Sequence, residues 1–278
     1  MPTILNGRDL AASLRAELKN KVAELNLTPR LGVILVGDDP ASHLYVALKE
    51  KAAKEVGIGV EKILLPNSAA KEDIIAKVEF FNNRPDIHGI LIQLPLPPQL
   101  NEHEIISAMN PEKDADGFHP HNLTNLQNNQ TAVIPGVTAG IIKLIELSGQ
   151  TLAQKQACLI VNSDEFALPL KKLLQDRVAK VNIIHTPEPK DLQVADIVVV
   201  ALGQPQIIKG EFIKDGAVLI DVGTTKVNGK VMGDVDATSL ANRDVYLTPV
   251  PGGVGPMTVV MLLWNVYHLA RQLAEKTV

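Results

Sequence analysis

The stretch CLIVNSDEFALPLKKLL (residues 158–174) runs from an apolar strand pattern into an amphipathic helix pattern and contains no glycine. In the second half of an α/β chain, such a strand-to-helix turn is where the phosphates of a dinucleotide lie, and glycine lets the backbone approach them. The stretch therefore predicts an α/β fold. It also raises the question whether a dinucleotide binds here at all.

Helix and strand patterns alternate through the first half of the chain. Apolar residues at helical spacing begin the series, and prolines in 89–97 exclude a helix there. The patterns predict a helix through Leu10, Leu14, Leu18, Val22 and Leu25, strands at 31–37, 60–65 and 89–97, and helices at 40–56, 71–82 and 102–109. The polar segment 110–129 is the longest break in periodicity, so we expect a loop close to a domain boundary.

The alternation resumes after this loop. We expect a helix at 138–147, the strand CLIVN, a helix from about 167, the strands KVNIIH, ADIVVVALG, AVLIDVG and VYLTPVPGG, and a final apolar helix beginning at PMTVV. Short apolar strands separated by segments of crossover length indicate a second parallel sheet with helices on both faces.

Composition narrows the class of protein. The chain has 278 residues, 46% hydrophobic and 21% charged, with a net charge of −4 and no run of Lys or Arg, so we expect no nucleic-acid partner. The N-terminus lacks an export signal and no apolar run approaches ~20 residues, which predicts a cytoplasmic protein without a membrane span. Cys158 is the only cysteine, so neither a disulfide nor a cysteine metal site is expected.

Two segments of the first half carry candidate chemistry. In SHLYVALKEKA, Tyr45 and Lys49 are four residues apart and share one helix face. The plain alternative is an exposed lysine beside a packed tyrosine. Gln93 stands at the carboxyl end of an apolar strand, where α/β folds bind their ligands, although a glutamine there is often only solvated.

Two further segments suggest a binding site. PEKDADGFHP places Asp114 and Asp116 two residues apart in a glycine-containing turn, where an aspartate can also serve only to stabilise the turn. TPVPGGVGPMT (248–258) carries three glycines between a strand and a helix. Such a loop lets backbone approach a ligand, and its alternative is a tight turn.

Together these four segments resemble the bifunctional methylenetetrahydrofolate dehydrogenase and methenyltetrahydrofolate cyclohydrolase family over the whole chain. The resemblance implies a folate cleft between two α/β domains: a catalytic domain of residues 1–138 and 257–278, and a Rossmann-like domain of residues 139–256. It implies hydride transfer from 5,10-methylenetetrahydrofolate to NADP, followed by hydration of the methenyl cation to 10-formyltetrahydrofolate. Homodimers are also implied.

The resemblance assigns roles on the helix and strand of the first half. Lys49 is implied as the catalytic lysine, because burial beside a cationic substrate favours a neutral amine that can accept a proton. Gln93 is implied to hold Lys49 in place. Tyr45 is implied to pack on the folate.

Substrate-binding residues follow in the same way. Asp116 is implied to accept hydrogen bonds from the amino group and ring N–H of the pterin, which one carboxylate can do at once. Pro251, Gly252 and Gly253 are implied to line the other wall of the cleft. No metal is expected.

The opening stretch departs from the family's usual V-x-G-x-S-x-x-V-G-x-P, which has an arginine before the serine. Aligned on Ser163, the chain has Val161 for the first glycine, Asn162 for the arginine and Ala167 for the second glycine. Val161 then places a branched side chain where backbone must approach phosphate, and Asn162 lacks the guanidinium that would bind a 2′-phosphate. The implied cofactor-binding residues are Asn162, Ser163 and Asp164.

Acidic residues strengthen the departure. Asp164 and Glu165 add negative charge to the turn, and HTPE (185–188) replaces a polar or basic family segment. We therefore expect weak NADP binding, with the cyclohydrolase as the main activity. The alternatives are an enzyme with cyclohydrolase activity only, or a non-catalytic folate-binding homologue, against which the retained Lys49 argues. The folate motifs oppose a third alternative, an unrelated Rossmann dehydrogenase.

Overall fold

The computed structural model describes residues 1–25 and 27–276. The chain divides into two compact units. Met1–Ala11 and Val137–Thr258 form one, here called the six-stranded unit; Ala12–Gly136 and Val259–Val278 form the other, the three-stranded unit. The domain boundaries expected at 138/139 and 256/257 stay a prediction. The expected boundaries differ from this division mainly at residues 1–11. The last two residues of the expected catalytic domain, 277–278, lie outside the described residues.

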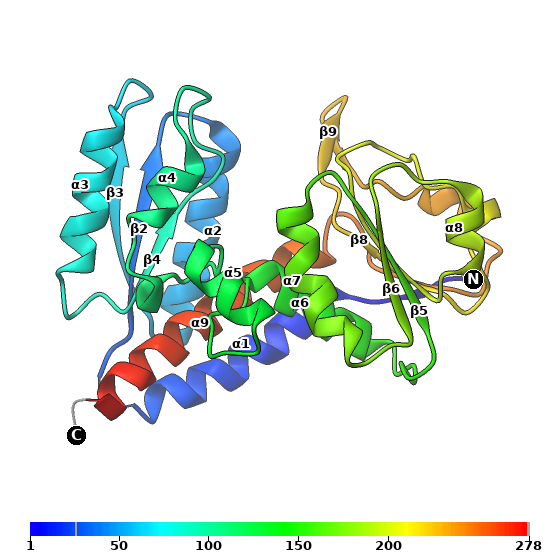
Figure 1. Ribbon diagram of the computed structural model, residues 1–278, viewed down its shortest axis with the longest axis horizontal. Helices are drawn as coiled ribbons and strands as arrows, with labels where there is room; N and C mark the ends of the chain where they lie inside the picture. Colours follow the sequence, from blue (N-terminus) through cyan, green and yellow to red (C-terminus); the bar gives the residue numbers. More distant parts are fainter. Residues whose placement is uncertain (26, 277–278) are drawn as a thin grey trace. The chain divides into compact units, whose positions relative to one another are not determined.

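The three-stranded unit is a parallel sheet in the order β3-β2-β4 with helices packed around it (Figure 1). Its elements are α1 (Gly7–Ala23, which begins in the other unit), β2 (Arg30–Val36), α2 (Pro40–Val56), β3 (Gly59–Leu65), α3 (Lys71–Asn82), β4 (Gly89–Ile92), α4 (Glu102–Ser107), the 3-10 turn η1 (Pro111–Lys113), α5 (Pro120–Gln127) and most of α9 (Val254–Lys276). The strands and helices expected before residue 110 are all present, but the strand expected at 89–97 ends at Ile92.

Local capping explains why α2 has the predicted bounds. The Asp39 carboxylate accepts the N–H of Ser42, and Pro40 stands at the start of the helix, where a missing N–H costs nothing. Gly57 ends the helix at φ 83°, the left-handed conformation that glycine adopts without strain. This helix carries Tyr45 and Lys49, so the capping residues fix the element on which these candidate site residues lie.

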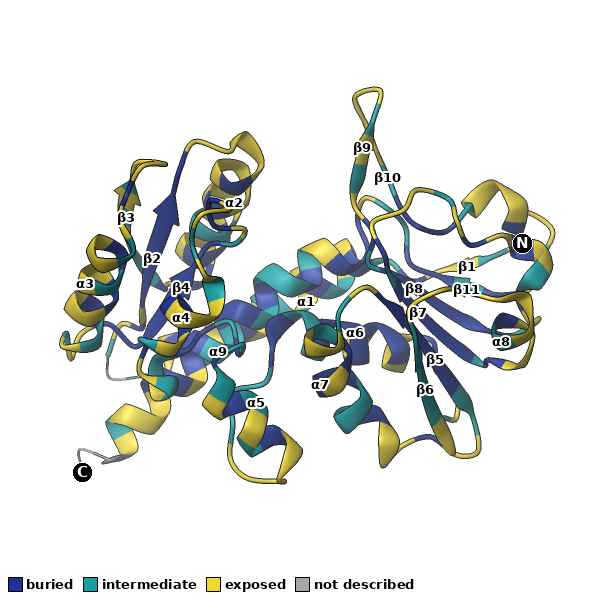
Figure 2. Cartoon of the chain, turned by 45° about the horizontal axis from the view of Figure 1, so that its top comes forward, coloured by how far each residue is buried: buried dark blue, intermediate teal, exposed yellow. Residues whose placement is uncertain are grey.

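The C-terminal helix completes the core of the three-stranded unit. Leu262, Leu263 and Val266 of α9 are fully buried, and they pack in one cluster with Leu31 of β2 and Leu91 of β4. The strand β4 is buried along its length and β2 from residue 31 to 36, as their dark blue in Figure 2 shows, whereas the edge strand β3 is only partly buried. The final apolar helix expected from the sequence is therefore present, and it is packed at these residues.

The expected loop at 110–129 was wrong in part, because it contains η1 and the helix α5. His119 caps α5: its Nδ1 accepts the N–H of His121 at 3.0 Å, and Pro120 follows at the first helical position. Only Asn122 and Leu126 of this helix are buried. So short a helix, with so few buried residues, leaves no clear hydrophobic period to detect.

The six-stranded unit is a wholly parallel sheet in the order β1-β11-β8-β7-β5-β6. Its elements are β1 (Thr3–Ile4), α6 (Gly136–Leu147), β5 (Gln156–Val161), α7 (Asp164–Gln175), β6 (Lys180–Ile184), α8 (Pro189–Val194), β7 (Ile197–Ala201), η2 (Gly210–Phe212), β8 (Val218–Asp221), β9 (Thr225–Val227), β10 (Lys230–Met232), η3 (Ala237–Leu240) and β11 (Tyr246–Leu247). The expected two-domain α/β class with a second parallel sheet is confirmed.

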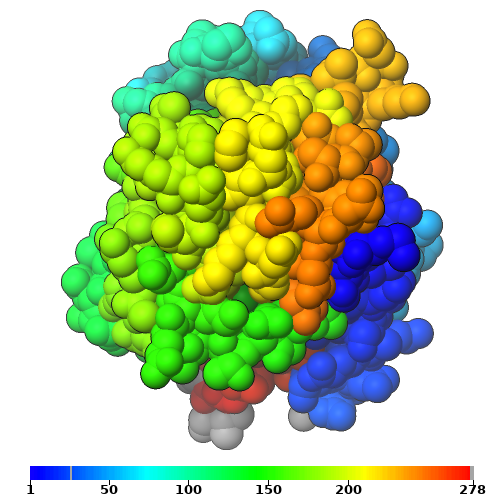
Figure 3. Space-filling view, turned by 90° about the vertical axis from the view of Figure 1, so that its right-hand side faces the viewer, coloured from blue at the N-terminus to red at the C-terminus, as the bar shows by residue number. Residues whose placement is uncertain are grey.

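Three features of this unit were not predicted from the sequence. The strand β1 is two residues long and pairs with β11, and Figure 3 shows the N-terminal residues (blue) against the orange segment that contains β11. The short helix α8 and the β9–β10 hairpin were also missed. In addition, α7 begins at Asp164 rather than near 167. Short elements carry too few residues to establish a period.

Candidate functional site

A lysine and a glutamine meet in the three-stranded unit. The Nζ of Lys49 on α2 donates a hydrogen bond of 2.8 Å to Oε1 of Gln93, which follows directly after β4. Gln93 is buried, and its own Nε2 donates to the carbonyl of Leu94 at 2.5 Å. Because Nε2 is engaged there, the amide presents its oxygen to the lysine. The sequence-predicted pair is therefore in direct contact.

Electrostatics links Lys49 to Asp116. Burial lowers the pKa of Lys49, and the nearby negative charge of Asp116 opposes this effect. Burial raises the pKa of Asp116, while Lys49 acts in the opposite direction and Asp114 adds to the rise. Each group thus shifts toward its neutral form. A proton can be moved at this lysine nearer to neutral pH than at an exposed one.

Asp114 has a different environment from Asp116. Its carboxylate is buried and accepts the N–H of Gly117 at 2.9 Å, the N–H of His119 at 2.8 Å and Nδ2 of Asn122 at 3.0 Å. Because these hydrogen bonds all lie within the 114–122 segment, Asp114 stabilises the turn. The hydrogen bonds of Asp114 fit a turn-stabilising role, and the pterin-binding role expected of Asp116 stays a prediction.

Tyr45 lies on an exposed apolar strip of α2. Tyr45 is 44% exposed, and its neighbours Leu44 and Leu48 are 59% and 46% exposed. Large apolar side chains that remain in water on one helix face form a surface suited to an aromatic or apolar ligand. The strip belongs to the same helix as Lys49.

The glycines of 251–253 lie in the six-stranded unit and are packed tightly. The carbonyl oxygen of Gly252 accepts the N–H of Arg8 at 3.0 Å, and a Cβ on Gly7 would lie 1.9 Å from the carbonyl oxygen of Gly253. Glycine at 252 is explained by its φ of +118°, and glycine at 253 by a Cβ that would lie 2.8 Å from the carbonyl oxygen of Pro249. Pro251 beside them is exposed. A role for all three in folate binding stays a prediction.

The β5–α7 turn corrects one argument drawn from the sequence. The side chains of Val161 and Ala167 are both fully buried in the six-stranded unit. Val161 is the last residue of β5, and because it has no exposed surface its side chain does not line the space beside the turn. The expected steric obstruction by these two side chains is therefore wrong.

The electrostatic argument at this turn is supported. Asp164 and Glu165 occupy the first turn of α7 and place negative charge at the positive end of the helix dipole. The Nε2 of His185 lies 3.4 Å from Oδ1 of Asp164, and its Nδ1–H donates to the carbonyl of Val161 at 2.9 Å. The helix end is thus already complemented by the chain's own carboxylates. The charges of Asp164 and Glu165 oppose the negative phosphates of NADP, and weak NADP binding stays a prediction.

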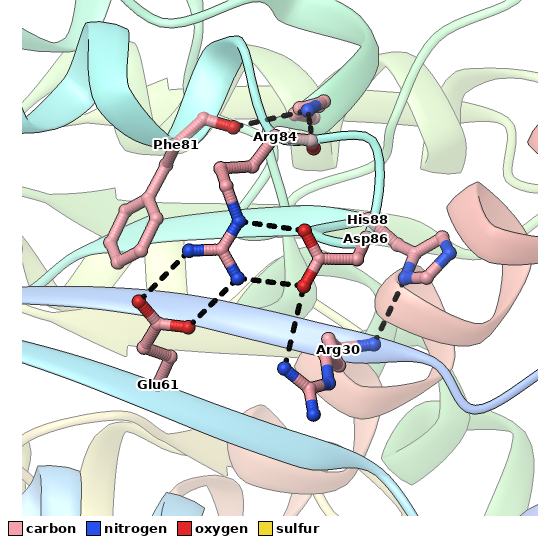
Figure 4. A network of polar contacts seen from close by, with 7 residues as sticks. Arg30, Glu61, Phe81, Arg84, Asp86 and His88 are labelled. Atoms are coloured by element: carbon pink, nitrogen blue, oxygen red, sulfur yellow. Dashed lines mark hydrogen bonds and ion pairs between the residues drawn. The ribbon is translucent and has the colours of Figure 1, made fainter.

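A second polar cluster lies at the amino-terminal end of β2 (Figure 4). The guanidinium of Arg84 pairs with both oxygens of Glu61 at 3.2 Å and both oxygens of Asp86 at 2.7 Å. Arg30 adds a contact to Asp86, and its backbone N–H donates to Nδ1 of His88 at 3.1 Å. The charges in this cluster are paired with one another, so its role is structural.

The sequence missed Asn265 of α9. Its Nδ2 donates to the carbonyl oxygens of Ala115 at 3.0 Å and of Ile134 at 2.9 Å. The signal that could have found it is an asparagine inside the apolar run MLLWNVYHL. A polar side chain among buried neighbours needs partners, so its presence there indicates specific contacts.

Two features are absent from the described part of the chain. Within residues 1–25 and 27–276, no helix has the length and apolarity that crossing a membrane requires. The same residues contain no group of three or more His, Cys, Asp or Glu side chains placed to bind a metal ion.

Two family models match the chain. Residues 5–116 match the model described as tetrahydrofolate dehydrogenase/cyclohydrolase, catalytic domain, and residues 135–274 match the model described as the NAD(P)-binding domain of the same enzymes. The region that contains the β5–α7 turn is therefore a domain of the NAD(P)-binding type.

Relatives match at full length. The bifunctional protein FolD of Geotalea uraniireducens is 41% identical over 98% of this chain and 100% of its own length, and that of Geobacillus thermodenitrificans is 42% identical over 98% and 99%. Among solved structures, the bifunctional FolD of Campylobacter jejuni has a TM-score of 0.93 at 35% identity, covering 98% of this chain and 99% of its own. The Trypanosoma brucei enzyme complexed with NADP and an inhibitor has a TM-score of 0.91 at 34% identity, covering 98% of both chains.

Proposed function

Because the chain belongs to the tetrahydrofolate dehydrogenase/cyclohydrolase family, we propose that it hydrates 5,10-methenyltetrahydrofolate to 10-formyltetrahydrofolate. The observation that carries this proposal is the 2.8 Å hydrogen bond from Lys49 to Gln93, with Lys49 electrostatically coupled to Asp116. A lysine whose pKa is lowered by burial is suited to proton transfer.

The reaction needs a proton acceptor and a proton donor in turn. As a water oxygen bonds to the methenyl carbon, the neutral Nζ of Lys49 accepts a proton from the water. When the bond from that carbon to N5 breaks, the ammonium of Lys49 returns a proton to N5, and the hydroxyl proton leaves to solvent as the formyl C=O forms. Gln93 holds Nζ in place through both steps.

The remaining residues bind the substrate in this proposal. Asp116 accepts hydrogen bonds from the amino group and ring N–H of the pterin, and the exposed ring of Tyr45 packs on the folate. A folate-binding role for Pro251, Gly252 and Gly253 is proposed from the family resemblance. The exposed apolar strip of α2 supports the packing role of Tyr45.

The dehydrogenase step is the family's second activity, and here we propose that it is the weaker one. The domain is of the NAD(P)-binding type, so 5,10-methylenetetrahydrofolate with NAD or NADP is the substrate pair to test. Asp164 and Glu165 at the α7 end oppose the phosphates, and Asn162 offers no positive charge to a 2′-phosphate. An enzyme with cyclohydrolase activity only is therefore the second candidate.

Two properties follow from the resemblance to the family. We propose that the protein is a homodimer and that it acts in the cytoplasm. Sedimentation at equilibrium tests the first and cell fractionation the second. A monomer at all concentrations would contradict the dimer.

One assay tests the proposed function. The absorbance of 5,10-methenyltetrahydrofolate is followed with and without the protein, and the formation of NADPH or NADH from 5,10-methylenetetrahydrofolate is followed in parallel. We expect rapid loss of the methenyl absorbance and slow reduction of NADP. Binding of tetrahydrofolate without any acceleration of hydration would instead support the non-catalytic folate-binding alternative.

A further inference from the structure

The side-chain amide of Asn265 joins two loops that are distant in the sequence. Both hydrogens of its Nδ2 are committed, one to the carbonyl of Ala115 at 3.0 Å and one to the carbonyl of Ile134 at 2.9 Å. Ala115 directly precedes Asp116, and Ile134 belongs to the segment that leads into α6. The helix α9 thereby reaches the backbone beside the proposed pterin ligand.

The same two loops touch again just after Asp116. The carbonyl oxygen of Asp116 accepts the N–H of Gly136 at 3.2 Å. At Gly117 a Cβ would lie 2.5 Å from the backbone nitrogen of Pro135, and φ is +84°, so only glycine permits this approach. The Asn265 amide closes this junction from the α9 side.

The backbone around Asp116 is fixed on its other side as well. The N–H of Ala115 donates to the carbonyl of Ile90 at 3.1 Å, and the N–H of Gly117 donates to the Asp114 carboxylate at 2.9 Å. With the two loop contacts, hydrogen bonds hold both backbone groups of Ala115, the carbonyl of Asp116 and the N–H of Gly117. These contacts restrict movement of the backbone that carries the Asp116 carboxylate.

The hydrogen bonds of Asn265 explain why a polar side chain occupies a position among buried apolar residues. It is flanked by fully buried apolar residues of α9, including Leu263 and Val266. A polar side chain there is unfavourable unless it is hydrogen-bonded, and both of its donors are. Packing alone would be served by leucine, which has nearly the same shape.

We infer that Asn265 is a positioning residue for folate recognition, which acts by holding the backbone on either side of Asp116. The inference rests on the proposed function, because it assigns to Asn265 the placement of the carboxylate that accepts from the pterin. It adds a residue of the C-terminal helix, 150 positions along the chain, to a site otherwise built from α2, β4 and the 114–119 turn.

A double-mutant cycle tests the inference. Tetrahydrofolate affinity is measured by anaerobic calorimetry for the wild type, Asn265→Leu, Asp116→Asn and the double variant. Interacting residues give non-additive effects, and we expect Asn265→Leu to weaken binding about tenfold in the wild-type background and less than about twofold in the Asp116→Asn background.

Asn82→Leu is the matched control. Asn82 lies in the same unit, is also half-buried, and its side chain donates to the carbonyl of Ala108 at 2.9 Å and accepts the N–H of Asn110 at 2.8 Å. Both asparagine variants should lower the midpoint of urea unfolding, whereas only Asn265→Leu should change tetrahydrofolate affinity. If Asn265→Leu does not fold, Asn265→Ser, which keeps one donor, takes its place in the cycle.

The outcomes separate the inference from the function on which it rests. If Asp116→Asn leaves tetrahydrofolate affinity unchanged, the proposed role of Asp116 fails. If Asp116→Asn weakens binding but the Asn265 variant loses the same factor in both backgrounds, the positioning role is overturned. Equal loss of affinity in Asn82→Leu would also overturn it, because the effect would then follow general destabilisation.

Discussion

Lys49 and Gln93 are 44 residues apart in the sequence, yet the Nζ of one and the Oε1 of the other lie 2.8 Å apart. The contact exists because β4 pairs with β2, the strand that precedes α2, so the residue after β4 comes to lie beside that helix. The lysine is thereby held by a neutral amide rather than by a carboxylate. A neutral partner does not stabilise the ammonium as a carboxylate would, which suits a group that must lose its proton.

Lys49→Met should abolish the proposed hydration. Methionine has a similar length but can neither accept nor return a proton, so we expect the rate of methenyl absorbance loss to fall at least ~100-fold with the fold retained. Lys51→Met, an exposed lysine on the same helix, is the control and should keep full activity. Wild-type decay in the Lys49 variant would show that another group performs the proton transfer.

Asp116→Asn should move the pH dependence of turnover to lower pH. The negative charge of Asp116 raises the pKa of Lys49, and its removal leaves burial, which lowers that pKa, unopposed. If the neutral amine is the active form, the rise of kcat with pH should begin earlier in the variant. Measuring kcat at saturating substrate separates this effect from weaker binding. Glu50→Gln is the control, and an unchanged profile in Asp116→Asn would contradict the coupling.

Loss of the Asp116 carboxylate should reduce folate affinity, whereas loss of the Asp114 carboxylate should reduce the stability of the fold. Asp116→Ala should weaken folate binding by about 1.5–3 kcal/mol, the usual value for hydrogen bonds to a charged group. Asp114→Ala leaves buried donors without partners, so we expect it to lower the free energy of unfolding by at least ~1–3 kcal/mol. Urea titration and calorimetry measure the two quantities. Equal losses of folate affinity in the two variants would refute the distinction.

The ends of a helix can be predicted from the sequence where neighbouring residues determine them, as in α2. Asp39, Pro40 and Gly57 are adjacent to the helix they delimit, so their types alone give its bounds. The contact of Asn265 with Ala115 and Ile134 depends instead on three segments that meet only in the folded protein. The hydrophobic pattern of the sequence does not indicate such a contact. The burial of Val161 also follows from strand direction in the folded sheet, and the sequence argument wrongly placed that side chain beside a phosphate.

NADP should bind weakly, and charge should be the reason. Loss of two or three charge-assisted contacts, at about 1.5–3 kcal/mol each, moves a micromolar cofactor toward millimolar affinity. Asn162→Arg combined with Asp164→Ser should therefore tighten NADP binding more than NAD binding. Asp176→Asn, at the other end of α7, is the control and should change neither. Micromolar NADP binding by the wild type in calorimetry would disprove the expectation.

Protonation of His88 should destabilise the fold. Burial lowers the pKa of His88 in the folded protein, and its Nδ1 accepts the N–H of Arg30, which requires an unprotonated nitrogen. The unfolded chain takes up this proton near its ordinary pKa of about 6.5, so stability falls as pH decreases from there toward the lowered value.

His88→Gln should reduce that loss, as measured by urea unfolding at about pH 7.5 and about pH 5.5. Burial raises the pKa of Asp221 to about 6, which acts in the opposite direction, because an acid that binds protons more readily when folded gains stability as pH falls. Asp221 is the same in both proteins, so the difference between them isolates His88. An identical pH dependence in wild type and variant would exclude a contribution from His88.

The pairing of β1 with β11 determines when the protein can fold during synthesis. Thr3 pairs with Tyr246, so the first strand made by the ribosome has no partner until nearly the whole chain has emerged. The core of the three-stranded unit also cannot be completed early, because Leu262, Leu263 and Val266 are translated after residue 260. Both units therefore depend on the last part of the chain, and a nascent polypeptide that stalls before β11 leaves two incomplete units exposed to chaperones and proteases.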